Sequence, residues 1–100
     1  MKDKSMRLRK IMGSDGKTVM IPMDHGLSMG PAGLEDIAGM AEKVAKGGAD
    51  AIVVHKGIAR FIKADAGMLI MTNGATALSI DGRDRARLCT VKEALALGAD

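Results

Sequence analysis

Three short polar motifs hold the side chains of this chain that are best suited to chemistry. They are Asp24-His25-Gly26, His55-Lys56-Gly57 and Thr72-Asn73-Gly74. Each motif directly follows an apolar run, and in parallel α/β folds the carboxyl ends of strands carry the functional residues. A glycine at the end of each motif lets the backbone approach a ligand closely. The three motifs therefore predict that the functional residues lie along one edge of a parallel sheet.

Asp24 is the strongest candidate for a catalytic residue. Its carboxylate comes directly after a buried apolar run, and partial loss of solvent suits a group that accepts and donates protons. The alternative is an aspartate whose side chain only caps the following turn. The residue pattern by itself supports both interpretations equally.

The other ionisable side chains of the motifs have a structural and a chemical interpretation. His25 and His55 could bind a metal ion, but a zinc site needs three or four ligands, and Cys89 lies apart beside a helix start. We therefore predict neither a metal nor a cofactor, and treat both histidines as hydrogen-bonded residues. Lys56 could be desolvated and form an imine. The alternative, which we favour, is a lysine that neutralises a carboxylate such as Asp24 or binds a phosphate.

Buried strands must lead into these motifs. Continuous apolar runs rich in β-formers predict strands at residues 18–23, 51–56 and 68–72, with burial on both faces as in a parallel sheet. Pro22 is tolerable only near a strand end, where its missing N–H can go unpaired. Asn73-Gly74 marks a turn after the third run, and the following residues up to Arg87 show no regular pattern.

Helices are expected between the strands. Apolar side chains at a spacing of three or four begin at Leu34, and Gly47-Gly48 ends this helix. A short helix is predicted over residues 58–64. A last helix is expected to begin at Thr90, which forms a capping box with Glu93.

The tripeptide Gly-Ala-Asp occurs twice, at residues 48–50 and 98–100. The first copy ends a helix and leads directly into a predicted strand, so the second is expected to lead into a further strand. The chain therefore shows a βα alternation cut in mid-unit, with open sheet edges. The competing interpretation is a complete flavodoxin-like domain, which the second copy argues against.

The composition limits the classes of protein to which the chain can belong. Of 100 residues, 47% are hydrophobic and 27% charged, and no apolar run approaches the roughly 20 residues of a membrane span. A single cysteine and the lack of an export signal predict a cytoplasmic location. The net charge of +3 is mild, and the basic residues 2–10 have no interleaved aromatics that could stack on bases. We expect a solvated arm and turn over residues 1–17, with no nucleic-acid and no membrane partner.

The order of these motifs resembles the start of the archaeal-type class I aldolases. Residues 18–31 are similar to the first strand and loop of that family, with Asp24-His25-Gly26 after the strand and Gly30-Pro31 four residues further on. Residues 47–57 are similar to its second strand, and the resemblance covers nearly the whole chain. It implies an α/β fold, the N-terminal part of a (β/α)8 TIM barrel with parallel strands, truncated before the fourth main strand. Residues 18–100 would form its first three βα units.

The resemblance also implies a division of catalytic labour. In the family a lysine forms an imine with a ketose phosphate, a tyrosine shuttles protons, and an aspartate on the first strand assists them. Asp24 matches this aspartate, whereas the imine lysine and the tyrosine match no residue of this chain. Lys56 is therefore not expected to be the nucleophile, and the 100-residue chain alone is expected to be inactive. The family's sugar-phosphate segment matches residues 24–28, and Lys56 is expected to make an electrostatic contact with the substrate. The expected substrate-binding residues are therefore Asp24, His25, Gly26, Leu27, Ser28 and Lys56.

Two branches of the family fit these motifs. One comprises the fructose-bisphosphate aldolases. The other comprises transaldolases that join a deoxyketohexose phosphate fragment to aspartate semialdehyde, on an alternative route to dehydroquinate and aromatic amino acids. Residues 21–23 and 55–56 are more similar to the transaldolase branch, which we favour. The partners would be sugar phosphates and aldehydes, and the full-length protein would be a homo-oligomer, a large ring assembly in relatives. A hypothesis of another class is an inactive fragment that binds a sugar phosphate or a partner.

Overall fold

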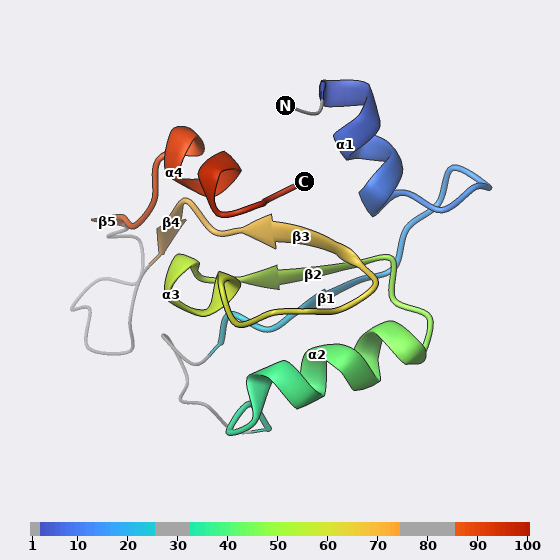
Figure 1. Cartoon of the computed structure of the whole chain (residues 1–100), viewed down its shortest axis with the longest axis horizontal. Coiled ribbons are helices and arrows are strands. Elements are labelled where there is room, and N and C mark those ends of the chain that lie inside the picture. Colours follow the sequence, from blue (N-terminus) through green and yellow to red (C-terminus); the bar gives the residue numbers. More distant parts are fainter. Residues whose placement is uncertain (1–2, 26–32, 75–85) are drawn as a thin grey trace.

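The computed structural model of the protein describes residues 3–25, 33–74 and 86–100 (Figure 1). Its elements are, in chain order, α1 (Lys4–Ile11), β1 (Met20–Pro22), α2 (Ile37–Lys46), β2 (Ala51–Val54), α3 (Lys56–Ala59), β3 (Gly67–Ile70), β4 (Asn73–Gly74), β5 (Ala86–Arg87) and α4 (Val91–Ala96). Strands β1, β2 and β3 form one parallel sheet in that order. The predicted succession of parallel strands is confirmed.

The strands are shorter than the apolar runs that predicted them. β2 stops at Val54 because His55 is already the N-cap of α3. Lys56 therefore belongs to a helix and not to the second strand, which corrects both the predicted strand end and the predicted start of the short helix. The third run is followed by β4 instead of a simple turn, and β4 pairs antiparallel with β5. The residues between β4 and β5 lie outside the described ranges.

Helices α2 and α3 contribute to the core on one face of the parallel sheet. Because alternate residues of a strand point to opposite faces, Ile52 and Val54 of β2 lie on the same face, and both are fully buried. They pack with Met23, which follows β1, and with side chains of α2 and α3 in a core cluster of Met23, Ala41, Ile52, Val54 and Ala59. Figure 1 shows α2 running along the sheet. None of the helices in the described ranges has the length and apolar character needed to cross a membrane.

The strands differ in burial. β2 is buried or half-buried at every position, as predicted for a central parallel strand. β1 is an edge strand, and Val19 and Met20 are 54% and 40% exposed, so the prediction of burial on both faces is wrong for this strand. The nitrogen of Pro22 faces away from β2, since the next residue, Met23, donates its N–H to the carbonyl of Val53 at 2.8 Å and alternate residues bond to the same neighbour. The proline therefore leaves the ladder intact.

The basic N-terminal segment forms a helix, where the sequence predicted only a solvated arm; most of its residues are exposed. α1 begins at the N-cap Asp3, whose side chain accepts a hydrogen bond from the N–H of Met6 at 2.9 Å. The predicted turn follows it, with Gly16 at a φ of 78°. Ile11, at the end of α1, is buried against the start of β3, where a Cβ on Gly67 would lie 2.5 Å from the Ile11 Cγ2. Only glycine at this position lets α1 pack so closely.

Both Gly-Ala-Asp corners have the same geometry. The N–H of Asp50 donates to the carbonyl of Val19 at 2.9 Å, and the Asp50 Oδ2 accepts from the N–H of Val19 at 2.8 Å. Asp100 makes the same two bonds to Met68 of β3, at 2.8 and 3.1 Å. Asp100 therefore lies beside β3 as Asp50 lies beside β1, which is the geometry expected at the start of a strand.

Candidate active site

The first two predicted motifs meet at the carboxyl edge of the sheet. Asp24 and His25 come shortly after β1, His55 comes directly after β2, and all three residues are half-buried. The Nε2 of His55 lies 3.1 Å from the backbone carbonyl oxygen of Asp24. The structure therefore brings Asp24 and His55 together. The predicted substrate contacts of residues 26–28 lie outside the described residues.

The backbone that carries the Asp24 carboxylate is held on both sides. The last ladder bond between β1 and β2 runs from the N–H of Met23 to the carbonyl of Val53 at 2.8 Å. One residue later, the contact with His55 holds the carbonyl of Asp24. A carboxylate that lies at the carboxyl edge of a parallel sheet is in the position where such folds bind ligands and transfer protons.

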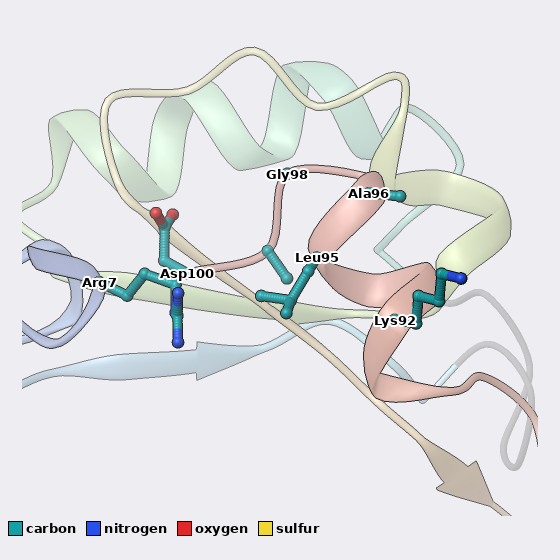
Figure 2. Close-up of a pocket in the computed structure, with 7 residues that line it drawn as sticks. Arg7, Lys92, Leu95, Ala96, Gly98 and Asp100 are labelled. Atoms are coloured by element: carbon teal, nitrogen blue, oxygen red, sulfur yellow. The ribbon is translucent and has the colours of Figure 1, made fainter. Parts of the chain in front are cut away.

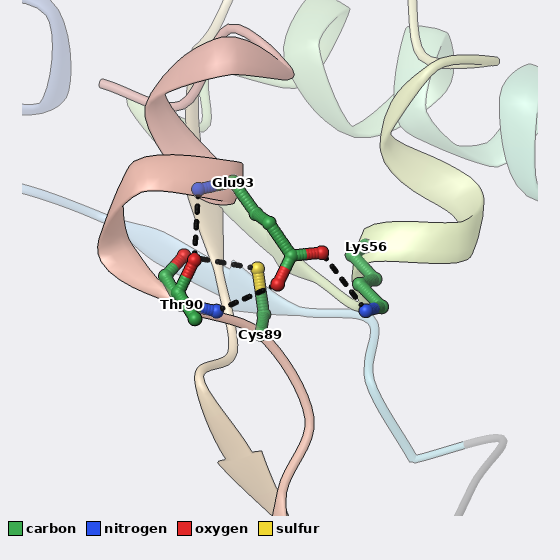
Figure 3. A network of polar contacts seen from close by, with 4 residues as sticks. All are labelled: Lys56, Cys89, Thr90 and Glu93. Atoms are coloured by element: carbon green, nitrogen blue, oxygen red, sulfur yellow. Dashed lines mark hydrogen bonds and ion pairs between the residues drawn. The ribbon is translucent and has the colours of Figure 1, made fainter.

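Lys56 pairs with a different carboxylate from the one predicted. Its Nζ lies 3.0 Å from the Oε2 of Glu93 on α4, and both side chains are 46% exposed (Figure 3). Glu93 also completes the predicted capping box, in which its Oε1 accepts from the N–H of Thr90 at 3.2 Å and Thr90 Oγ1 accepts from the N–H of Glu93 at 3.0 Å. The Lys56 ammonium, followed by the Thr90 N–H, lowers the pKa of Glu93. The pair joins the start of α3 to the start of α4, and its carboxylate is Glu93 and not Asp24.

The third motif borders a cavity of about 610 Å³. The carbonyl of Thr72 accepts hydrogen bonds from the N–H groups of Leu88 and Cys89, at 2.8 and 3.2 Å. Cys89 is buried, and its thiol donates to the carbonyl of Thr90 at 3.3 Å. The cavity is lined by Thr72, Asn73, Arg87, Cys89, Thr90 and Val91. Sequence reasoning placed neither Arg87 nor Cys89 here, because the pairing of β4 with β5 has no local signal.

A second cavity, of about 440 Å³, lies between α1 and α4 (Figure 2). Its lining residues are Arg7, Lys92, Leu95, Ala96, Gly98, Ala99 and Asp100. Most of them belong to α4 and to the second Gly-Ala-Asp corner, so this cavity is separate from the contact of Asp24 with His55. Among the residues that the structure describes, no three His, Cys, Asp or Glu side chains are grouped so that they could hold a metal ion.

Comparison with known proteins relates the chain to aldolases. The family model of the DeoC/LacD family aldolases matches residues 18–100. A 2-amino-3,7-dideoxy-D-threo-hept-6-ulosonate synthase of Halobacterium salinarum is 40% identical to the chain, and synthase 1 of Archaeoglobus fulgidus is 37% identical; each match covers 97% of this chain and 38% of the relative. A class 1 fructose-bisphosphate aldolase of Thermoproteus tenax is 30% identical over 90% of this chain and 37% of its own length. The chain thus spans well under half of these relatives.

Solved structures share the architecture of the chain. A Schiff-base-forming fructose-1,6-bisphosphate aldolase superposes with a TM-score of 0.75 at 27% identity, covering 97% of this chain and 42% of its own. An archaeal fructose-1,6-bisphosphate aldolase, with its catalytic lysine bound to the carbinolamine intermediate, superposes with a TM-score of 0.74 at 27% identity over 97% and 41%. The predicted fold class, part of a parallel-strand α/β barrel, is confirmed. The chain belongs to the DeoC/LacD family of aldolases.

Proposed function

We propose that the full-length protein is a Schiff-base (class I) transaldolase of ketose phosphates. Its activity would be that of a 2-amino-3,7-dideoxy-D-threo-hept-6-ulosonate synthase, on an alternative route to dehydroquinate and aromatic amino acids. The observation that carries the proposal is the identity to two such synthases, 37% and 40%, against 30% to a fructose-bisphosphate aldolase. The second candidate is a class I fructose-bisphosphate aldolase, which the solved structures favour. Both candidates use the same imine chemistry.

Asp24 is the residue to which we assign proton transfer. An imine between a lysine and a ketose draws electrons from the adjacent carbon–carbon bond, which can then break. A nearby carboxylate takes and returns the proton of the sugar hydroxyl, and in its ionised form it stabilises the iminium cation. The half-buried position of Asp24 after β1 supports this role. The imine lysine would come from a part of the barrel that residues 1–100 do not include.

The remaining assignments concern substrate binding and cellular context. The proposed contacts are made by Asp24, His25, Gly26, Leu27, Ser28 and Lys56. Lys56 is the least supported of them, because Glu93 pairs with its ammonium at 3.0 Å; its proposed contribution is an electrostatic attraction for a phosphate. We assign no metal or cofactor to the reaction, since the imine itself is the electron sink. Sugar phosphates and aldehydes are the proposed partners of a cytoplasmic homo-oligomer.

Borohydride trapping in the full-length protein tests the proposal. The protein is reduced in the presence of a deoxyketohexose phosphate or of fructose bisphosphate, and the modified lysine is mapped by mass spectrometry. We expect an adduct on a lysine outside residues 1–100, and faster condensation with aspartate semialdehyde than cleavage of fructose bisphosphate. The 100-residue chain alone should form no adduct.

Three other outcomes would change the proposal. An adduct on Lys56 would make that residue the nucleophile. Faster cleavage of fructose bisphosphate would favour the second candidate. Binding of sugar phosphates without any adduct would replace catalysis by binding.

A further inference from the structure

His55 occupies the N-cap position of α3, yet its side chain makes no capping hydrogen bond. Oxygen-bearing side chains are favoured at this position because they accept an N–H of the first helical turn. The N-caps of the other three described helices, Asp3, Asp36 and Thr90, all do so. The start of α3 therefore does not explain why residue 55 is a histidine.

The imidazole of His55 instead reaches the segment that follows β1. Its Nε2 lies 3.1 Å from the carbonyl oxygen of Asp24, in a partly buried contact. A carbonyl oxygen only accepts hydrogen bonds, so the Nε2 must carry the hydrogen. The last backbone bond between the two strands joins Met23 to Val53. The His55 side chain therefore links the segments that follow the two strands, beyond the end of the ladder, at the residue that bears the proposed catalytic carboxylate.

We propose that His55 is a positioning residue, which donates its Nε2 hydrogen to the Asp24 carbonyl and thereby fixes the direction of the Asp24 carboxylate. This inference rests on the function proposed above for Asp24. The residue next to the donor, Lys56, also contacts α4, where its ammonium pairs with Glu93 at 3.0 Å (Figure 3). Without the bond, the Asp24 carbonyl loses its contact with the residue that follows β2. A displacement of about 1 Å at a reacting group can reduce a rate about a hundredfold.

Two variants of similar size separate the hydrogen bond from the bulk of the side chain. In the full-length protein, His55→Gln keeps an N–H donor, whereas His55→Met removes it; Lys63→Gln, at an exposed residue after α3, is the control. We expect His55→Met to lower kcat about tenfold to a hundredfold with KM changed less than about threefold, and His55→Gln to stay within about threefold of wild type. An unchanged kcat in His55→Met overturns the proposal. If His55→Met does not fold, a folded His55→Gln enzyme with a loss of more than about tenfold in kcat overturns it.

The histidine tautomer gives a readout that does not depend on turnover. ¹⁵N spectra of histidine-labelled protein, with His55 assigned by the signal lost in His55→Gln, should show neutral His55 protonated at Nε2. A neutral Nδ1–H tautomer overturns the contact, whether or not the enzyme is active. A wild-type protein without activity but with the Nε2–H tautomer overturns the proposed function, and the positioning role with it, while the hydrogen bond stands.

Discussion

The two ends of the parallel sheet are held together in different ways. At the amino end, the aspartate of each Gly-Ala-Asp corner is hydrogen-bonded to the backbone at the start of a strand. Ile11 of α1 packs directly against Gly67 of β3. Figure 1 shows α1 beside this end. At the carboxyl end, side chains join neighbouring elements: His55 reaches Asp24, and Lys56 reaches Glu93.

The difference separates the residues that stabilise the fold from those that can do chemistry. At the amino end, the residue type is limited by backbone geometry and by contact distances that no ligand changes. At the carboxyl end, the ladder has ended, and a side chain can be exchanged without loss of a strand. Substitutions at the amino end should therefore lower stability, and substitutions at the carboxyl end should mainly lower activity.

The largest expected effect is that of Asp24→Asn in the full-length protein. The amide keeps the shape of the side chain but cannot take up the proton, so turnover should fall by about 10²–10⁴. Thermal unfolding should change little. The matched control at the amino end is Asp15→Asn, because an asparagine oxygen can still accept the bond from the N–H of Lys17 at 3.0 Å. Full activity in Asp24→Asn would leave Asp24 as a turn cap.

At the amino end, Gly67→Ala should have the largest effect on stability. The added methyl would lie 2.5 Å from the Ile11 Cγ2 and 2.8 Å from the carbonyl oxygen of Lys10. Separating α1 from β3 should lower the free energy of unfolding by about 1–3 kcal/mol, measured with urea. Gly57→Ala is the control, since a Cβ there meets nothing within 4 Å. If Gly67→Ala unfolds like wild type, α1 does not pack against β3 as described.

Asp50→Ala tests whether the two corners are equivalent. Loss of the carboxylate removes the acceptor of the exposed Val19 N–H, which should cost about 0.5–1.5 kcal/mol of stability. Asp50→Asn, which keeps an acceptor oxygen, should cost less. Asp100→Ala should have a similar effect in the full-length protein, because Asp100 makes the same two bonds to Met68. A clear difference between the two alanine variants would show that only one corner stabilises the fold.

The smallest effect is expected at the carboxyl end, from Glu93→Gln. The hydrogen bond from Lys56 lowers the pKa of Glu93 in the folded protein. The stabilising contribution is therefore complete above the unfolded pKa of the carboxyl group and disappears as the pH falls through the lower folded value. Unfolding midpoints measured from about pH 7 to 3 should fall less steeply for Glu93→Gln than for wild type. Equal slopes would mean that the exposed pair contributes nothing measurable.

Local signals in the sequence determined where the strands lie and what kind of sheet they form. Each of the runs 18–23, 51–56 and 68–72 overlaps an observed strand over half of its length or more, because continuous β-formers bounded by turns leave few alternatives. The capping box of Thr90 and Glu93 was equally local and is present as predicted. The order of the motifs also indicated the aldolase family that the comparisons show.

Only the tertiary structure decided which side chains meet. His55 and Asp24 lie 31 residues apart in the chain, and Lys56 and Glu93 lie 37 apart. Such pairs depend on where a strand ends and a helix begins. Because α3 starts at Lys56, the ammonium of Lys56 pairs with Glu93 in the capping box of α4 and not with Asp24. The sequence did not predict α1, because its mostly polar residues give no apolar stripe. Its buried contact is made by Ile11, at the end of the helix. Sequence periodicity reports the face that a segment buries, whereas the packing of distant elements decides its partner.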